Sequence, residues 1–156
     1  MQAEMGVNPW WAALTIWGVV NAVNLLQAAG FFSRVATGSM NINGVLGRII
    51  IVLAIPTMAA LFAFVRAGAG RLHRIGPIVF LAFVAFMITV DYAWPVEFRS
   101  PMRPSILVPY LVLFFGAIFL MGFPMFRMNR GLWLVTVATS ALLLGSMGLA
   151  MSRGVG

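Results

Sequence analysis

The 156-residue sequence contains no cysteine, no lysine, one histidine and only three acidic residues. Without cysteine the chain forms no disulfide and offers no thiol nucleophile or thiolate metal ligand. A single histidine, His73, does not make a histidine pair for haem or a cluster for a metal. No spacing of Ser, His, Asp or Glu places a nucleophile beside a base within an apolar run. We therefore expect no cofactor and no metal, and favour a non-catalytic protein over an enzyme.

Charge is scarce as well, and it is almost all of one sign. Charged residues make up 8% of the chain and hydrophobic residues 62%, against about 25% and roughly 45–50% in soluble domains. The net charge of +7 comes from ten arginines, which stand singly or in pairs between apolar runs. Arginines placed in this way flank membrane spans and meet lipid phosphate. With no basic groove in the pattern, we expect no binding of nucleic acid.

Five apolar segments are each close to the 20 or so residues that cross a bilayer core of about 30 Å. The sequence therefore predicts an all-α fold, an integral membrane bundle of five transmembrane helices with short loops, as one domain over residues 1–156. The predicted spans cover residues 9–32, 45–65, 75–94, 105–126 and 131–151. The four residues 127–130 between the last two spans predict antiparallel neighbours, whereas residues 33–44 and 95–104 are expected to form longer links.

Arginines in short loops favour the cytoplasmic side of a membrane, and here they divide evenly between the two sides. One group would share the side of the N-terminus: Arg66, Arg71, Arg74, Arg127 and Arg130. The other group would lie opposite: Arg34, Arg48, Arg99, Arg103 and Arg153. Because the first group is denser and closer to its helix ends, we expect the N-terminus to lie in the cytoplasm. The expected membrane is a prokaryotic cell membrane.

Polar side chains inside the spans are costly in lipid and need protein or water around them. Asn21, Asn24 and Gln27 recur every three residues and fall on one side of the first span. Arg48 and Asp91 lie one turn inside the ends of the second and third spans, at the same end of the bundle. The pattern favours an Arg48–Asp91 ion pair joined by the amides of the first span. Such a cluster either holds three helices together or forms the floor of an outward-facing pocket.

The segment after Asp91 combines acids, arginines, aromatics and prolines. It adds candidate ligand-binding residues to the cluster: Tyr92, Trp94, Glu97, Arg99 and Arg103. Aromatic side chains in such a segment would lie at the depth of lipid headgroups, and its arginines could bind phosphate. The segment is interpreted either as an anchored loop that caps the bundle or as the rim of the same pocket.

Two functions from different classes follow from this pattern. In the first, the protein binds or transports a small or amphipathic, lipid-like molecule in the outward-facing polar pocket. In the second, it is a structural or accessory subunit without catalytic activity. The small residues Ala141, Gly145 and Gly148 permit close helix approach, and this is expected within the bundle rather than between protomers. Expected partners are membrane lipids and either another membrane protein or a second copy of the chain. The last two spans are otherwise expected to serve packing.

Overall fold

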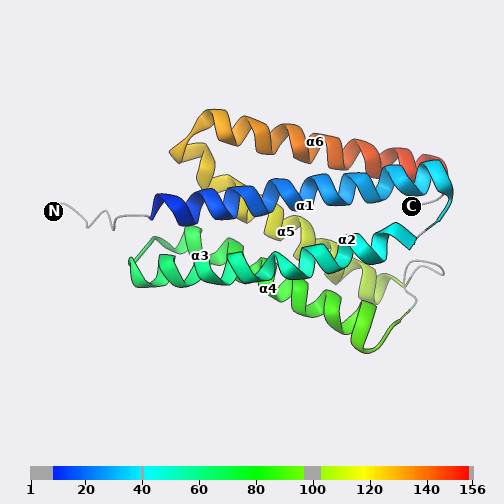
Figure 1. Ribbon diagram of the computed structural model, residues 1–156, viewed down its shortest axis with the longest axis horizontal. Coiled ribbons are helices and arrows are strands. Elements are labelled where there is room, and N and C mark those ends of the chain that lie inside the picture. Colours follow the sequence, from blue (N-terminus) through cyan, green and yellow to red (C-terminus); the bar gives the residue numbers. More distant parts are fainter. Residues whose placement is uncertain (1–8, 40, 97–102, 155–156) are drawn as a thin grey trace.

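The protein is described by a computed structural model for residues 9–39, 41–96 and 103–154, and this part of the chain is helical with no strand (Figure 1). Five of its helical segments are long and apolar enough to cross a membrane, which confirms the predicted all-α, five-span fold. The elements are α1 (Trp10–Thr37), α2 (Asn41–Val52), α3 (Ala54–Arg66), α4 (Arg71–Ile88), the π-helical turn η1 (Thr89–Ala93), α5 (Pro104–Met128) and α6 (Arg130–Ser152).

The first helix is longer than predicted, and the link that follows it is shorter. Helix α1 continues beyond Phe32 to Thr37 and ends at Gly38, whose φ of 66° lies in the left-handed region. The Gly38 N–H donates to the carbonyl of Arg34 at 2.8 Å, a common way for glycine to end a helix. The prediction of an irregular link over residues 33–44 is therefore wrong, because polar residues can occupy a helix that extends beyond the hydrocarbon. Arg34 consequently belongs to the last turn of α1.

The second span consists of two helices, with a break at Leu53. Pro56 has no N–H and cannot donate to the carbonyl of Val52, one turn earlier, so the regular pattern is interrupted there. The carbonyl of Leu53 accepts from the Thr57 hydroxyl at 2.8 Å and from the Thr57 N–H at 3.3 Å. The break separates α3, which packs against α1 and α4, from α2, which lies mainly beside α1.

The third span ends in a wide π-helical turn. Pro95 favours an extended conformation for the residue before it, and Trp94 has φ −127° and ψ 80°. The Trp94 N–H donates to the carbonyl of Thr89, five residues back, at 2.8 Å. Turns of this type are rare and are often found at functional sites. This one changes the directions of Asp91 and Tyr92 from those of a regular α-helix.

The last two spans are antiparallel neighbours, as the short link predicts. Asn129 alone separates α5 from α6, and its side-chain oxygen accepts a hydrogen bond from the Leu132 N–H at 3.1 Å. The most extensive packing is between α1 and α6 and between α4 and α5. Figure 1 shows α4 diverging from α1 toward its C-terminal end, so the bundle is wider at that end.

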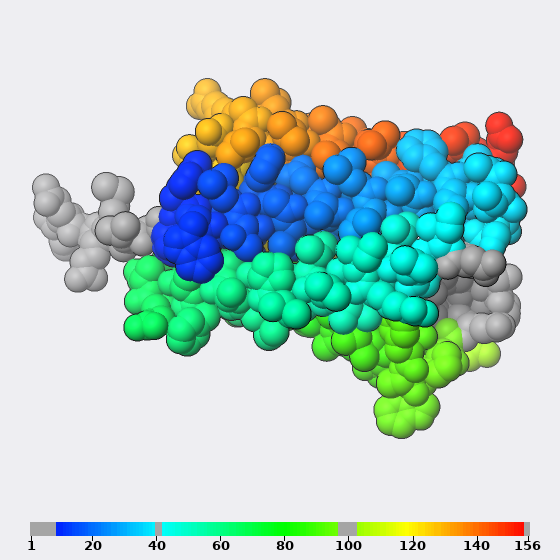
Figure 2. All heavy atoms as spheres, viewed as in Figure 1, coloured from blue at the N-terminus to red at the C-terminus, as the bar shows by residue number. Residues whose placement is uncertain are grey.

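The outer surface of the bundle is apolar. Large side chains on two different spans are mostly exposed, including Ile55 of α3 at 64%, and Val112 at 64% and Phe119 at 67% on α5. Exposed apolar surface on this scale is typical of contact with lipid. Figure 2 shows α6, α1 and the α2–α3 pair forming one face, with the end of α4 and η1 projecting beside α2. The helix lengths and this surface together indicate an integral membrane protein.

Candidate functional site

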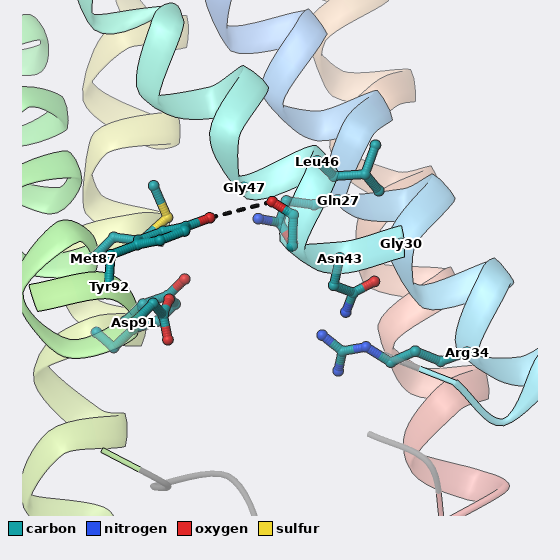
Figure 3. A pocket seen from close by; sticks show the side chains of 11 residues that line it. Gln27, Gly30, Arg34, Asn43, Leu46, Gly47, Met87, Asp91 and Tyr92 are labelled. Atoms are coloured by element: carbon teal, nitrogen blue, oxygen red, sulfur yellow. Dashed lines mark hydrogen bonds between the residues drawn. The ribbon is translucent and has the colours of Figure 1, made fainter. Parts of the chain in front are cut away.

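A cavity of about 240 Å³ opens at the wider end of the bundle. It lies between α1, α2, η1 and α5, and Figure 3 shows side chains from both sides directed into it. The residues that line it are Gln27, Gly30, Arg34, Asn43, Gly44, Leu46, Gly47, Met87, Asp91, Tyr92 and Tyr110. An arginine, a carboxylate and two amides therefore meet at the end of a bundle whose interior is otherwise largely apolar.

The wall formed by α1 and α2 carries the basic and amide groups. With its amide oxygen turned toward Arg34, Asn43 accepts hydrogen bonds from Nε and Nη2 of the guanidinium. The same guanidinium lies over the ring of Phe31, 5.1 Å from the ring centroid, an attractive cation–π arrangement. Gly30 permits the approach of the two helices, because a Cβ there would lie 3.1 Å from the amide end of Asn43. Arg34 is thus held in position from two directions.

The opposite wall carries the acidic and phenolic groups. Asp91 and Tyr92 come from η1, and Tyr110 comes from α5. The Tyr92 hydroxyl crosses to α2 and donates to the carbonyl of Gly44 at 3.3 Å, the dashed line in Figure 3. Tyr110 packs edge-on against the buried ring of Phe83, with centroids 5.2 Å apart. The floor is apolar, since Met87 is fully buried beneath the cavity.

Gly47 makes room for the contact between the two walls. A Cβ at this position would lie 2.8 Å from the Tyr92 hydroxyl oxygen, which is closer than real Cβ contacts occur. Gly44, one turn earlier on the same helix, would meet nothing within 4 Å. The two glycines line the same cavity, but only Gly47 is needed for the position of Tyr92.

Arg48 does not belong to this cavity. Its side chain is exposed, it is absent from the lining, and in the described ranges it makes no ion pair with Asp91. Arg48 lies about 100° further around α2 than Gly47, which directs it away from the cavity. The predicted Arg48–Asp91 pair is therefore wrong, and the arginine that enters the cavity is Arg34.

Asn21 and Asn24 are buried against α6 and lie away from the cavity. Asn21 donates to Thr136 Oγ1 at 3.2 Å and accepts from Thr139 Oγ1 at 2.7 Å. Asn24 donates to the hydroxyls of Thr139 at 3.1 Å and Ser140 at 2.9 Å. The last span, which is expected to serve packing, therefore also supplies the hydroxyls that satisfy these amides.

Some of the other predicted site residues line the cavity and some lie outside it. Gln27, Asp91 and Tyr92 line the cavity, whereas Trp94 and Arg103 are exposed outside it. Glu97 and Arg99 lie outside the described residues. The assignment of a ligand to any of these residues stays a prediction.

Most of the residues that line the cavity were not predicted: only Gln27, Asp91 and Tyr92 were candidate site residues. Arg34 and Asn43 were assigned to an irregular link, and the glycines of α1 and α2 were not considered as lining residues. Gly38 was the available signal, because glycine commonly ends a helix and would have extended α1 past Arg34. Gly44 and Gly47, three residues apart, were a second signal for close approach on one helix face.

Three small residues on α6 face away from the interior of the bundle. Ala141, Gly145 and Gly148 are exposed, and a Cβ at either glycine would meet nothing within 4 Å. Close helix approach within the bundle therefore does not explain these two glycines.

Comparisons with protein-family models, with curated proteins and with solved structures find no match to this chain.

Proposed function

We propose that the protein binds or passes a small or amphipathic molecule in the cavity between α1, α2, η1 and α5. The observation that carries this proposal is the convergence of Arg34, Asp91 and two amides in a cavity of about 240 Å³. A cavity with a few convergent polar groups is the default hypothesis for a ligand site. An apolar floor beneath polar walls is typical of ligand sites.

The level of the cavity favours an amphipathic ligand. Helix α1 has 28 residues and at about 1.5 Å per residue is about 42 Å long, more than the hydrocarbon core of about 30 Å. Arg34 lies in its last turn, and Asn43 lies in the first turn of α2. These groups therefore lie at the depth of lipid headgroups, where a polar group can enter the cavity while an apolar chain stays in lipid.

Native mass spectrometry of the full chain tests this proposal. The protein would be released in mild detergent from vesicles of phosphatidylethanolamine, phosphatidylglycerol and cardiolipin. We expect each chain of the unchanged protein to retain one molecule. We expect the Arg34→Gln variant to lose it. Arg153→Gln is the matched control, because Arg153 is exposed at the same end of the bundle and outside the cavity. The proposal would be contradicted if both variants retained the molecule equally, or if the unchanged protein retained no molecule at all.

A protein partner in stoichiometric amount during the same purification would favour the alternative, an accessory subunit. Such a partner would have the exposed face of α6 available for contact. An intact complex that retains no small molecule would replace the stand-alone binder with that alternative.

We also propose that the N-terminus is cytoplasmic, which makes the cavity outward-facing. The denser arginine group at the end where α3 and α5 finish supports this orientation. Because the chain has no cysteine, single cysteines can be labelled without background. Ser152→Cys and Gly70→Cys lie at opposite ends. We expect an impermeant maleimide to label only the first in intact cells, and labelling of only the second would reverse the orientation.

A further inference from the structure

The cavity carries opposite charges on opposite walls. Arg34 reaches in from α1, and Asp91 reaches in from η1 on the other side, as Figure 3 shows. We propose that the cavity selects a zwitterion, with its anionic group at Arg34 and its primary ammonium group at Asp91. This inference rests on the proposed function and names the class of ligand that the same site takes.

The anionic group is assigned to the α1–α2 wall because Arg34 is positioned there before any ligand arrives. Asn43 accepts from the guanidinium, and the ring of Phe31 lies beneath it at 5.1 Å. A guanidinium has five N–H donors in a planar fork. The fork matches the oxygens of a phosphate or carboxylate, and Gln27 adds an amide on the same wall.

The ammonium group is assigned to the opposite wall because its groups attract cations. Asp91 supplies a carboxylate, and the aromatic rings of Tyr92 and Tyr110 line the cavity beside it. A carboxylate with neighbouring aromatic faces is a favourable environment for an ammonium ion. A primary ammonium has three N–H donors, which can be shared between the carboxylate and neighbouring oxygens.

The opposite charges of the two walls favour a zwitterion over a singly charged ligand. A purely anionic ligand would place its charge in the same small space as Asp91, and like charges repel. A purely cationic ligand would meet the same difficulty at Arg34. The cavity of about 240 Å³ is smaller than the roughly 300–1,000 Å³ of pockets that hold drug-sized molecules, so it suits a headgroup-sized molecule.

A phosphate joined to a primary ammonium fits this description, and it can come from two sources. One is the phosphoethanolamine headgroup of a phospholipid whose acyl chains stay in the membrane. The other is a free molecule with the same headgroup. Both present the same chemistry to Arg34 and Asp91.

The test measures binding of three probes to the full chain in detergent micelles. The first is dihexanoyl phosphatidylethanolamine, and the second is its N-acetyl derivative, which keeps the phosphate and lacks the ammonium charge. The third is glycerophosphoethanolamine, which has no acyl chain. We expect the first lipid to bind about tenfold more tightly than its N-acetyl derivative, the effect of one charged hydrogen bond.

Two variants assign the two halves of the ligand to the two walls. Asp91→Asn should bind both lipids with about equal affinity, because it removes the carboxylate that recognises the ammonium. Arg34→Gln should weaken both lipids by about tenfold, because both keep the phosphate. Arg153→Gln should match the unchanged protein, and circular dichroism checks that each variant is folded.

Every outcome separates the two proposals. Binding of glycerophosphoethanolamine as tight as that of the lipid identifies a free zwitterion as the source, and binding of the lipid alone identifies a headgroup. If both lipids bind equally to the unchanged protein and Arg34→Gln weakens both, the zwitterion is wrong and the proposed function holds. If Asp91→Asn keeps the full preference for the lipid with the ammonium group over its N-acetyl derivative, the assignment of the ammonium group to Asp91 is wrong. If no probe binds better to the unchanged protein than to Arg34→Gln, both proposals fail.

Discussion

The two ends of the bundle differ in the residues between their helices and in how closely those helices meet. At the end where α4 begins and α5 finishes, Phe64, Met121 and Met125 are buried around a space of only about 10 Å³. At the other end, the helices leave about 240 Å³ between Arg34 and Asp91. We call these the closed end and the open end.

Glycine has a different role at each end. At the closed end, a Cβ on Gly76 would lie 2.8 Å from the backbone of Leu120, so this glycine sets the distance between α4 and α5. At the open end, the nearest atoms to a Cβ on Gly30 or Gly47 belong to side chains, the Tyr92 hydroxyl among them. Gly76 at the closed end therefore sets the distance between two helices, whereas Gly47 at the open end leaves room for the side chain that joins the two walls of the cavity.

The largest expected effect is at the closed end. Gly76→Ala should lower the free energy of unfolding by about 1–3 kcal/mol, because the added methyl group meets backbone that cannot move aside. Unfolding by titration with sodium dodecyl sulfate from mixed micelles would measure it. Gly145→Ala is the matched control on α6, where a Cβ meets nothing within 4 Å. A Gly76→Ala protein as stable as that control would show that the α4–α5 crossing is not closely packed.

The second effect tests which arginine belongs to the open end. Arg34→Gln should weaken binding of dihexanoyl phosphatidylethanolamine by about tenfold, or about 1.4 kcal/mol. Arg48→Gln removes the same charge nearby, from an exposed position outside the cavity, and should leave the affinity unchanged. Titration calorimetry in detergent would measure both. The reverse result would favour the Arg48 pocket that the sequence predicts.

The closed end and the five spans were predictable because they depend on composition and length. Runs of about 20 apolar residues separated by arginines predict helices regardless of how the helices pack. Asp91 and Gln27 were predicted at the open end for a similar reason, since polar residues in spans must be placed away from lipid.

The arrangement of the open end was less predictable because it depends on small backbone details. The end of α1 at Gly38 decides that Arg34 is helical, and the π-helical turn decides where Asp91 and Tyr92 point. The side of α1 that carries Asn21 and Asn24 was predicted to face protein or water rather than lipid. Periodicity alone could not show that its partner is α6, because a face of a helix does not specify which neighbour covers it.

The third effect concerns the contact between the two walls of the open end. Gly47→Ala should displace the Tyr92 hydroxyl and weaken phosphatidylethanolamine binding by about 0.5–1.5 kcal/mol, the net contribution of a typical hydrogen bond. Gly44→Ala is the matched control, because its Cβ meets nothing within 4 Å on the same helix. Tyr92→Phe should reproduce the effect of Gly47→Ala. Equal affinities for the two glycine variants would show that the position of Tyr92 does not matter for binding.

The smallest effect lies between the ends, where α1 meets α6. Asn21→Ala should cost about 0.6 kcal/mol of stability or somewhat more, the average for such bonds between membrane helices. Asn24→Ala should cost less, although it removes the same atoms from a more deeply buried site. The reason is that Asn24 Oδ1 has no hydrogen-bond partner among the described residues, whereas both amide atoms of Asn21 are bonded. A buried acceptor without a partner is itself unfavourable, so its loss offsets part of the cost.

The same two variants also decide whether the amides of α1 act as one site. Neither Asn21 nor Asn24 lines the cavity, so both variants should bind phosphatidylethanolamine as the unchanged protein does. Gln27, one turn further along α1, does line it, so Gln27→Ala should weaken binding. If Asn24→Ala lowers the affinity as much as Gln27→Ala does, the amides of α1 act as a single site. Unchanged affinity in the asparagine variants would instead separate the α1–α6 contact from the site at the open end.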